Sequence, residues 1–201
     1  DRAWATLGIV GPASGAGSLQ RVIHDATGSQ QPRGWDTQLR DEPVFALGAA
    51  RNWRLPLHEG DLRGMDLVLL SAASAGNLET QVDAGFLLRG GRQLARSFAT
   101  ASLLPGRDVN PLAGSRRIAA NLYVGMLWRY QLWNVALDGN LGDPSGSTVT
   151  RRPGQYYYAG GVSWSLGDLG FLLSMARSSP LYREADDGDW FGSLSLTWRY
   201  R

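Results

Sequence analysis

The chain has 201 residues, a formal net charge of +2, and neither cysteine nor lysine. This length is compatible with one domain, and the charge is too small to indicate a nucleic-acid partner. The lack of cysteine excludes a disulfide framework and a thiolate metal site, and no apolar run reaches the roughly 18 residues that a membrane-spanning helix requires.

The first expected element is a β-strand at residues 3–10, which leads into a long connection at residues 11–43. Early in this connection, apolar residues recur at helical spacing and predict one or two turns of helix: Leu19, Val22 and Ile23. Gln20 and His24 are one helical turn apart, so they would share one face of that helix. A histidine on a short helix is therefore inserted into a chain that otherwise has the pattern of strands.

Further segments alternate in hydrophobicity and are expected to be strands: residues 44–54, 65–74, 78–89, 118–134, 155–166, 169–178 and 190–200. The alternation is clearest in GQYYYAGGVSWSL, WFGSLSLTWRY and ANLYVGMLWR. Successive strand residues point to opposite faces, so each segment has an apolar face and a face rich in Ser, Gly, Thr, Asn and Arg. This pattern fits a soluble β-domain with an apolar core and also a membrane barrel with an apolar exterior.

The placement of the aromatic residues favours the membrane barrel. On the apolar faces they lie toward the strand ends, with aliphatic residues between them: Trp128, Tyr156, Trp164, Trp190, Trp198 and Tyr200. Amphipathic rings gather in this way at membrane interfaces, whereas a soluble core more often places its largest side chains centrally. The sequence therefore predicts an all-β protein, with a single antiparallel transmembrane β-barrel domain of about eight strands over residues 1–201.

The connections between the expected strands alternate in length, as in bacterial barrels with short periplasmic turns and longer outer loops. If the C-terminus is periplasmic, the long connections on the outer side are residues 11–43, 138–154 and 179–189. Residues 90–117 and 75–77 depart from this rule, because the first connection is long on the periplasmic side and the second is short on the outer side. The short helix with His24 is thus expected in an outer loop, beside the outer leaflet.

Several short motifs occur in an order that is similar to that of a known family. They are GIVGPASGAGSLQRVIHDATGSQQPRGWDTQLRDEP, then LDGN at residues 137–140, and the closing GSLSLTWRY. In this order and on a barrel-like pattern, they resemble the outer-membrane lipid A deacylases, which remove 3'-O-linked acyl groups from lipid A. The resemblance extends from about Gly8 to the C-terminus and so covers nearly the whole chain.

The resemblance implies a twelve-stranded barrel in the bacterial outer membrane, with lipid A or lipopolysaccharide as substrate and a divalent cation, usually calcium, as cofactor. It also implies roles for two residues of this chain. His24 would act as the general base that activates water, and Gln20 would orient the imidazole or the substrate. The hydroxide would attack the acyl carbonyl, while the cation and hydrogen-bond donors stabilise the oxyanion.

One part of the family pattern is missing. The acidic Glu-Asn-Asp motif of the family's N-terminal strands, thought to supply metal and oxyanion-site residues, has no counterpart in this chain. The metal ligands are therefore unknown, and the family's first four strands are expected to be absent. Either the chain is a fragment or natural truncation of such a barrel, or its eight strands close a smaller barrel, since eight is an allowed number.

Side chains of the outer loops are candidate substrate contacts. Forked arginine side chains can bind the phosphates of lipid A, which makes candidates of Arg33, Arg40, Arg151 and Arg152. Of these, Arg33 and Arg40 are predicted to bind substrate together with Trp35, which could instead pack the helix onto the rim. His58, in an expected periplasmic turn, is predicted to be inert. Two other functions stay open: a passive outer-membrane pore or structural barrel, and a soluble β-domain that binds a ligand.

Overall fold

The computed structural model describes residues 1–30, 38–60, 63–96, 118–143, 149–198 and 200. Within them the chain forms eight strands: β1 (Arg2–Val10), β2 (Glu42–His58), β3 (Gly64–Ala75), β4 (Glu79–Arg92), β5 (Ala119–Asn134), β6 (Gly154–Leu166), β7 (Leu169–Ser178) and β8 (Trp190–Trp198). The described helices are α1 (Ala16–Thr27), α2 (Val135–Asp138) and the 3-10 helices η1 (Pro12–Ser14) and η3 (Leu94–Arg96). None of these helices has the length and apolar character needed to cross a membrane.

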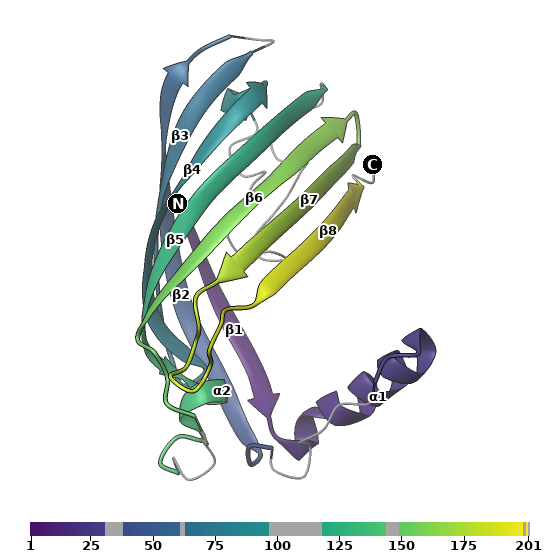
Figure 1. Cartoon of the computed structure of the whole chain (residues 1–201), viewed down its shortest axis with the longest axis vertical. Coiled ribbons are helices and arrows are strands. Elements are labelled where there is room, and N and C mark those ends of the chain that lie inside the picture. The colour runs from purple at the N-terminus through teal and green to yellow at the C-terminus, as the bar shows by residue number, and fades with distance from the viewer. Residues whose placement is uncertain (31–37, 61–62, 97–117, 144–148, 199, 201) are drawn as a thin grey trace.

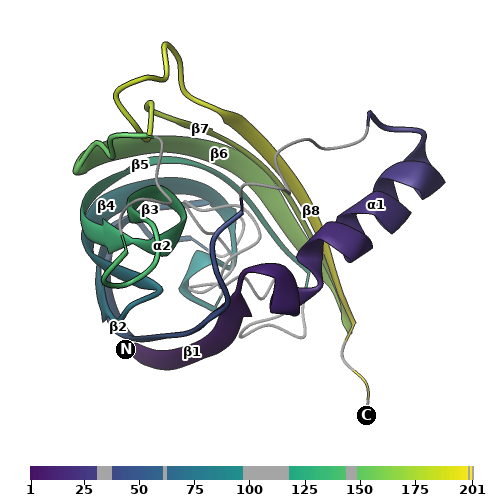
Figure 2. The same cartoon turned by 90° about the horizontal axis from the view of Figure 1, so that it is seen from below.

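The strands form one antiparallel sheet in which each strand pairs with its neighbour in sequence, in the order β1 to β8. Figure 1 shows this sheet as a strongly curved wall, and Figure 2 shows the same wall from below as an incomplete ring. Its edges are β1 and β8, which do not pair with each other in the described structure. The predicted antiparallel barrel wall is confirmed, whereas the alternative of a smaller barrel closed by these eight strands is wrong.

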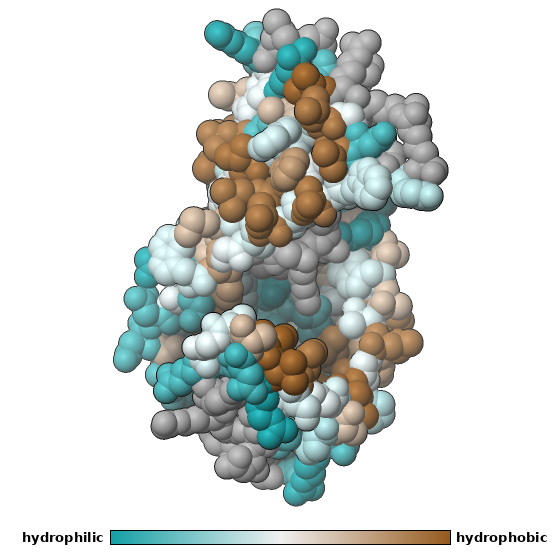
Figure 3. All heavy atoms as spheres, turned by 90° about the vertical axis from the view of Figure 1, so that its right-hand side faces the viewer, coloured by the Kyte–Doolittle hydropathy of each residue, from teal (hydrophilic) through white to brown (hydrophobic). Residues whose placement is uncertain are grey.

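The outer face of the wall is apolar, as the alternation predicts. Leu7 on β1, for example, is 84% exposed, and all the aromatic residues predicted at the membrane interfaces are exposed on this face. Trp128 lies opposite Tyr156 near the α1 end of the wall, and Trp164 stacks on Phe171 near the other end. On the face drawn in Figure 3, apolar side chains gather in a large patch in the upper part of the view. The outer face therefore has aromatic residues at both ends of an aliphatic band, as expected for a membrane-spanning wall.

The inner face of the wall carries ion pairs with little exposure at two positions along the strands. Toward the end opposite α1, the fully buried side chains of Asp66 and Arg89 form an ion pair at 2.7 Å. Nearer α1, Arg129 pairs with Asp83 at 2.8 Å. An apolar cluster lies along the same face and includes Val68, Leu87, Tyr123, Leu127, Tyr157 and Leu172. The predicted hydrogen-bonded interior is therefore present. It also contains more apolar side chains than the Ser, Gly, Thr and Asn residues of the inward faces predict.

Some elements differ from the sequence-based expectation. α1 has 12 residues, so it is longer than the one or two turns expected. β2 continues to His58, with a register shift between Pro56 and His58, so that His58 ends a strand instead of lying in a turn. Proline has no amide N–H for the ladder and is tolerated at such irregularities. α2 begins at Val135, where the sequence indicates a strand end followed by a turn.

α1, α2 and the connection between β7 and β8 lie at the same end of the wall (Figure 1), and we expect this end to face outward. In the cysteine-free chain, Arg21→Cys on exposed α1 should react with a membrane-impermeant thiol reagent on intact cells. Glu59→Cys, in the connection at the other end, should react only after the outer membrane is opened. The opposite labelling pattern would invert the topology and remove His24 from the leaflet that contains lipid A.

Candidate functional site

α1 projects from the end of β1 at the rim of the wall (Figures 1 and 2). Glycines in the left-handed region mark both of its ends, with φ 67° at Gly15 and φ 66° at Gly28. Glycine adopts this conformation without a steric penalty, so the chain can turn sharply before and after the helix. The apolar side chains of α1 are at least half exposed: Leu19 63%, Val22 64% and Ile23 50%. This apolar face therefore does not pack against the described wall.

His24 lies in the last turn of α1 and is half-buried. Its Nδ1 atom is 2.5 Å from the backbone carbonyl oxygen of Gln30. A carbonyl oxygen can only accept a hydrogen bond, so in the neutral ring Nδ1 carries the hydrogen and Nε2 keeps the lone pair. An imidazole held in this tautomer can accept a proton at Nε2, which is what a general base must do.

The turn after α1 brings the Gln30 carbonyl to the ring. The backbone N–H groups of Gly28 and Ser29 both donate to the carbonyl oxygen of His24, and Thr27 Oγ1 lies 2.8 Å from Ser29 Oγ. These bonds form a left-handed C-cap that reverses the chain. Sequence reasoning missed this orienting contact. The signal that could have revealed it is the glycine that directly follows the helical apolar spacing.

Gln20 lies one helical turn before His24, so the predicted sharing of a face is confirmed by the helix itself. Gln20 is half-buried, but no hydrogen bond joins it to the His24 ring among the described residues. The ring is held by a backbone carbonyl instead of the Gln20 amide. An orienting role for Gln20 stays a prediction.

The predicted substrate contacts are only partly described. Arg33 and Trp35 lie outside the described residues. The Arg40 side chain is 81% exposed and forms an ion pair with Asp143 at 2.9 Å. Because the side chain is so exposed, its guanidinium is accessible to an anionic ligand. An exposed ion pair of this kind also contributes little to stability, so a ligand can replace Asp143 at small cost.

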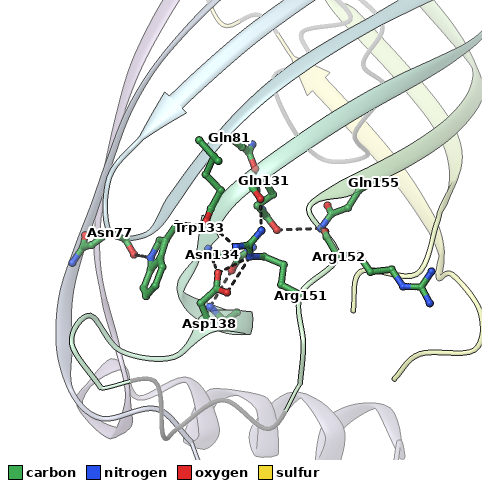
Figure 4. Close-up of polar contacts among 11 residues, drawn as sticks. Asn77, Gln81, Gln131, Trp133, Asn134, Asp138, Arg151, Arg152 and Gln155 are labelled. Atoms are coloured by element: carbon green, nitrogen blue, oxygen red, sulfur yellow. Dashed lines mark hydrogen bonds and ion pairs between the residues drawn. The ribbon is translucent and has the colours of Figure 1, made fainter. Parts of the chain in front are cut away.

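Arg151 and Arg152, the other arginines considered as phosphate ligands, are held by protein acceptors. Arg151 pairs with Asp138 at 2.8 Å and donates to two carbonyl oxygens near the end of β5 (Figure 4). Arg152 donates to two carbonyl oxygens of the β7–β8 connection. Beside them, the Thr150 N–H donates to Glu184 and holds the pKa of that carboxyl below its usual range. These bonds tie two connections together and give both arginines a structural role.

The resemblance to lipid A deacylases implies a divalent cation, which would need several acidic or histidine side chains close together. The described residues contain no group of three or more His, Asp or Glu side chains that could hold a metal ion. The described part of the chain therefore offers no cluster of acidic or histidine side chains that fits such a cation.

Nearly the whole chain, residues 1–200, matches one family model, described as outer membrane protein LpxR. The chain belongs to the LpxR family. The solved structure of LpxR from Salmonella typhimurium is similar, with a TM-score of 0.85 and 17% sequence identity, over 98% of this chain and 66% of that chain. The present chain thus spans just under two thirds of the length of the Salmonella structure. A comparison with curated protein sequences gives no match.

Membership of the LpxR family confirms the resemblance that the motif order indicates, and it places the protein in the outer membrane. The likeness to the Salmonella LpxR structure shows that the curved wall has the same fold. Because this chain covers 66% of that LpxR chain, an open ring is the expected form of the described part. In this open ring, the edge strands β1 and β8 do not pair with each other within the described residues.

Proposed function

We propose that the protein is an outer-membrane hydrolase that removes 3'-O-linked acyl chains from lipid A by histidine-assisted ester hydrolysis. The observation that carries the proposal is the His24 ring, whose Nδ1 is bound by the Gln30 carbonyl oxygen and whose Nε2 keeps its lone pair. LpxR family membership and the motif resemblance to lipid A deacylases support an acyl ester of lipid A as the bond that is cleaved.

In the proposed reaction, His24 Nε2 accepts a proton from water as the water oxygen attacks the carbonyl carbon of the acyl ester. The carbonyl π electrons move to oxygen, which gives a tetrahedral oxyanion. When this intermediate collapses, the bond between the carbonyl carbon and the sugar oxygen breaks, and the proton at Nε2 passes to the sugar oxygen. The products are a free fatty acid and a sugar hydroxyl group. Donation from Nδ1 to the Gln30 carbonyl stabilises the charged ring between the two proton transfers.

The surface around His24 supports a substrate with acyl chains and phosphates. An amphipathic helix with an exposed apolar face is suited to the membrane interface, where acyl chains can contact it. Gln20, on the same face as His24, is proposed to orient the ring or the substrate. The exposed guanidinium of Arg40 is proposed to bind a lipid A phosphate, with Arg33 and Trp35 as further substrate contacts.

A divalent cation is part of the proposal through the family resemblance alone, and its ligands are unknown. Activity in the presence of a chelator tests that part separately. The alternative function, a passive pore, is less well supported. The inner face of the described wall carries buried ion pairs and an apolar cluster, whereas a channel requires a hydrated lining.

Oxygen-18 from water gives a test of the proposed chemistry. The whole protein, purified in detergent, is incubated with lipid A in water enriched in oxygen-18, with heat-inactivated protein as the control. The released fatty acid should gain oxygen-18 in its carboxyl group and the sugar hydroxyl should gain none, because water attacks the acyl carbon. Label on the sugar, or an acyl chain transferred to another acceptor without label, would contradict the proposal.

A further inference from the structure

The motif LDGN, at residues 137–140, has no part in the proposed reaction, but its last residue contacts the connection that carries α1. Asn140 Oδ1 accepts a hydrogen bond from the backbone N–H of Arg40 at 2.9 Å, and Asn140 Nδ2 donates to the Arg40 carbonyl oxygen at 3.0 Å. Asn140 thus satisfies both backbone groups of a residue that lies 100 positions away in the sequence. A neighbouring strand would make the same two kinds of bond.

A carboxylate joins this contact. Asn140 Nδ2 also donates to Glu42 Oε2 at 2.9 Å, and the N–H of Leu141 donates to the same oxygen at 3.0 Å. The other carboxylate oxygen of Glu42 accepts a hydrogen bond from Asn77 Nδ2 at 3.0 Å. Asn140 is 7% exposed, so its amide group is shielded from water and costly to leave without its bonds. The segment with Arg40 and Glu42 is thereby fixed to two other connections at the rim.

The rest of the LDGN motif holds Asn140 in place. Asp138 accepts hydrogen bonds from the Asn134 N–H at 2.7 Å and from Arg151 at 2.8 Å, which closes the short helix α2 (Figure 4). Gly139 follows with φ 90°, in the region that favours glycine. The pair between Asp138 and Arg151 and the turn at Gly139 together direct Asn140 toward the α1 connection.

The two ends of the α1 connection also contact each other. Asp41 Oδ1 accepts a hydrogen bond from the backbone N–H of Ala13, just after β1, at 2.7 Å. Gly11 has φ 94° and lies so close to the returning chain that a Cβ there would be 2.6 Å from the carbonyl carbon of Arg40. The connection therefore begins and ends at one point, and Asn140 holds that point to the wall.

We infer that Asn140 is a positioning residue, which fixes the base of the α1 connection and so sets where His24 lies relative to the barrel wall. The apolar face of α1 does not pack against the described wall, so the position of the helix depends on the bonds at the base of its connection. The catalytic consequence of this inference rests on the proposed function. The structural consequence, a fixed position for α1, does not.

The structural test measures the distance between α1 and the wall in the whole protein. Nitroxide labels can be attached at Arg21→Cys on α1 and at Ala49→Cys, which is exposed on β2, in whole protein without other cysteines, since residues 1–201 contain none. Electron resonance distance measurements in lipid should give a narrow distribution for the doubly labelled protein. Asn140→Ala and Asn140→Asp should both broaden it. A carboxylate keeps the size of the asparagine side chain, but it cannot donate to the Arg40 carbonyl and it repels Glu42.

Asn121→Ala is the matched control. Asn121 is also a buried asparagine with a side-chain hydrogen bond, to Ser163 at 2.7 Å, but it lies at the opposite end of β5. This variant should keep the narrow distribution. A narrow distribution in both Asn140 variants, in protein that retains the heat-modifiable mobility of a folded barrel, would overturn the inference.

The catalytic test compares the kinetics of fatty-acid release from lipid A. A misplacement of about 1 Å can cost about 10²-fold in rate, so Asn140→Ala should lower kcat by up to about 10²-fold with little change in KM. A broadened distance distribution with unchanged kcat would overturn the positioning role. If the unsubstituted protein releases no fatty acid, the proposed function fails, while the distance distributions still decide whether Asn140 fixes α1.

Discussion

Replacement of His24 by alanine is expected to lower the rate of fatty-acid release from lipid A by about 10²–10⁴-fold, the usual contribution of general acid or base catalysis. The ring is half-buried on a projecting helix and bonds to a backbone carbonyl, so its loss should leave the barrel folded. The comparison requires the whole protein, because the present chain covers 66% of the Salmonella LpxR chain. The measured quantity is kcat/KM of the purified protein in detergent.

His58→Ala provides the matched control, because the chain contains 2 histidines and His58 ends β2 at the other end of the wall. Its kcat/KM should equal that of the unsubstituted protein. Gln20→Ala should lower kcat/KM less than His24→Ala, because an orienting residue does not itself take the proton. Full activity of the folded His24→Ala protein would falsify the assignment of the base.

The largest effect on stability is expected from Asp66→Ala on the inner face of the wall. Asp66 binds Arg89 at 2.7 Å and Arg54 at 2.5 Å, and the side chains of Asp66 and Arg89 are fully buried. Removal of one partner from a buried ion pair leaves the other charge buried, which typically costs about 3–5 kcal/mol. Urea titration in lipid vesicles should show a free energy of unfolding that is lower by about this amount.

Two further variants test whether the loss of stability in Asp66→Ala comes from the burial of the ion pair or from the loss of a charge. Asp187→Ala removes an exposed partner of Arg177, paired at 2.7 Å with Asp187 79% exposed, and should change the stability little. The double variant Asp66→Leu with Arg89→Met replaces the fully buried pair by apolar side chains, and Arg54 keeps its contact with Glu59 at 3.7 Å, so part of the lost stability should be recovered. Equal effects of Asp66→Ala and Asp187→Ala would show that burial of the pair does not determine its contribution.

The wall could be predicted because a strand that is buried on one face must alternate, and a slip of one residue would turn every side chain to the wrong face. On β6, Tyr156 and Trp164 point outward and Gln155 and Ser163 point inward, as the alternation predicts. The predicted bounds of β5 to β8 lie within two residues of those observed. Here the physical signal is local and repeats along each strand.

The contacts at the rim could not be predicted in the same way. Asn140 and Arg40 are 100 residues apart, and the LDGN motif by itself indicates no more than a turn. The bond between His24 and Gln30 is local, but it depends on the left-handed cap at Gly28, so helical spacing alone points to Gln20 instead. The orientation of the His24 ring therefore depends on the backbone turn after α1. In the sequence, only Gly28 indicates that turn.

The mass of lipid A from cells that express the whole protein gives the most direct evidence on the proposed deacylase. Lipid A from these cells should lose the mass of its 3'-O-linked acyl chains, whereas lipid A from cells that express His24→Ala should retain it. Unchanged lipid A in cells whose folded, unsubstituted protein reaches the outer membrane would contradict the proposed function.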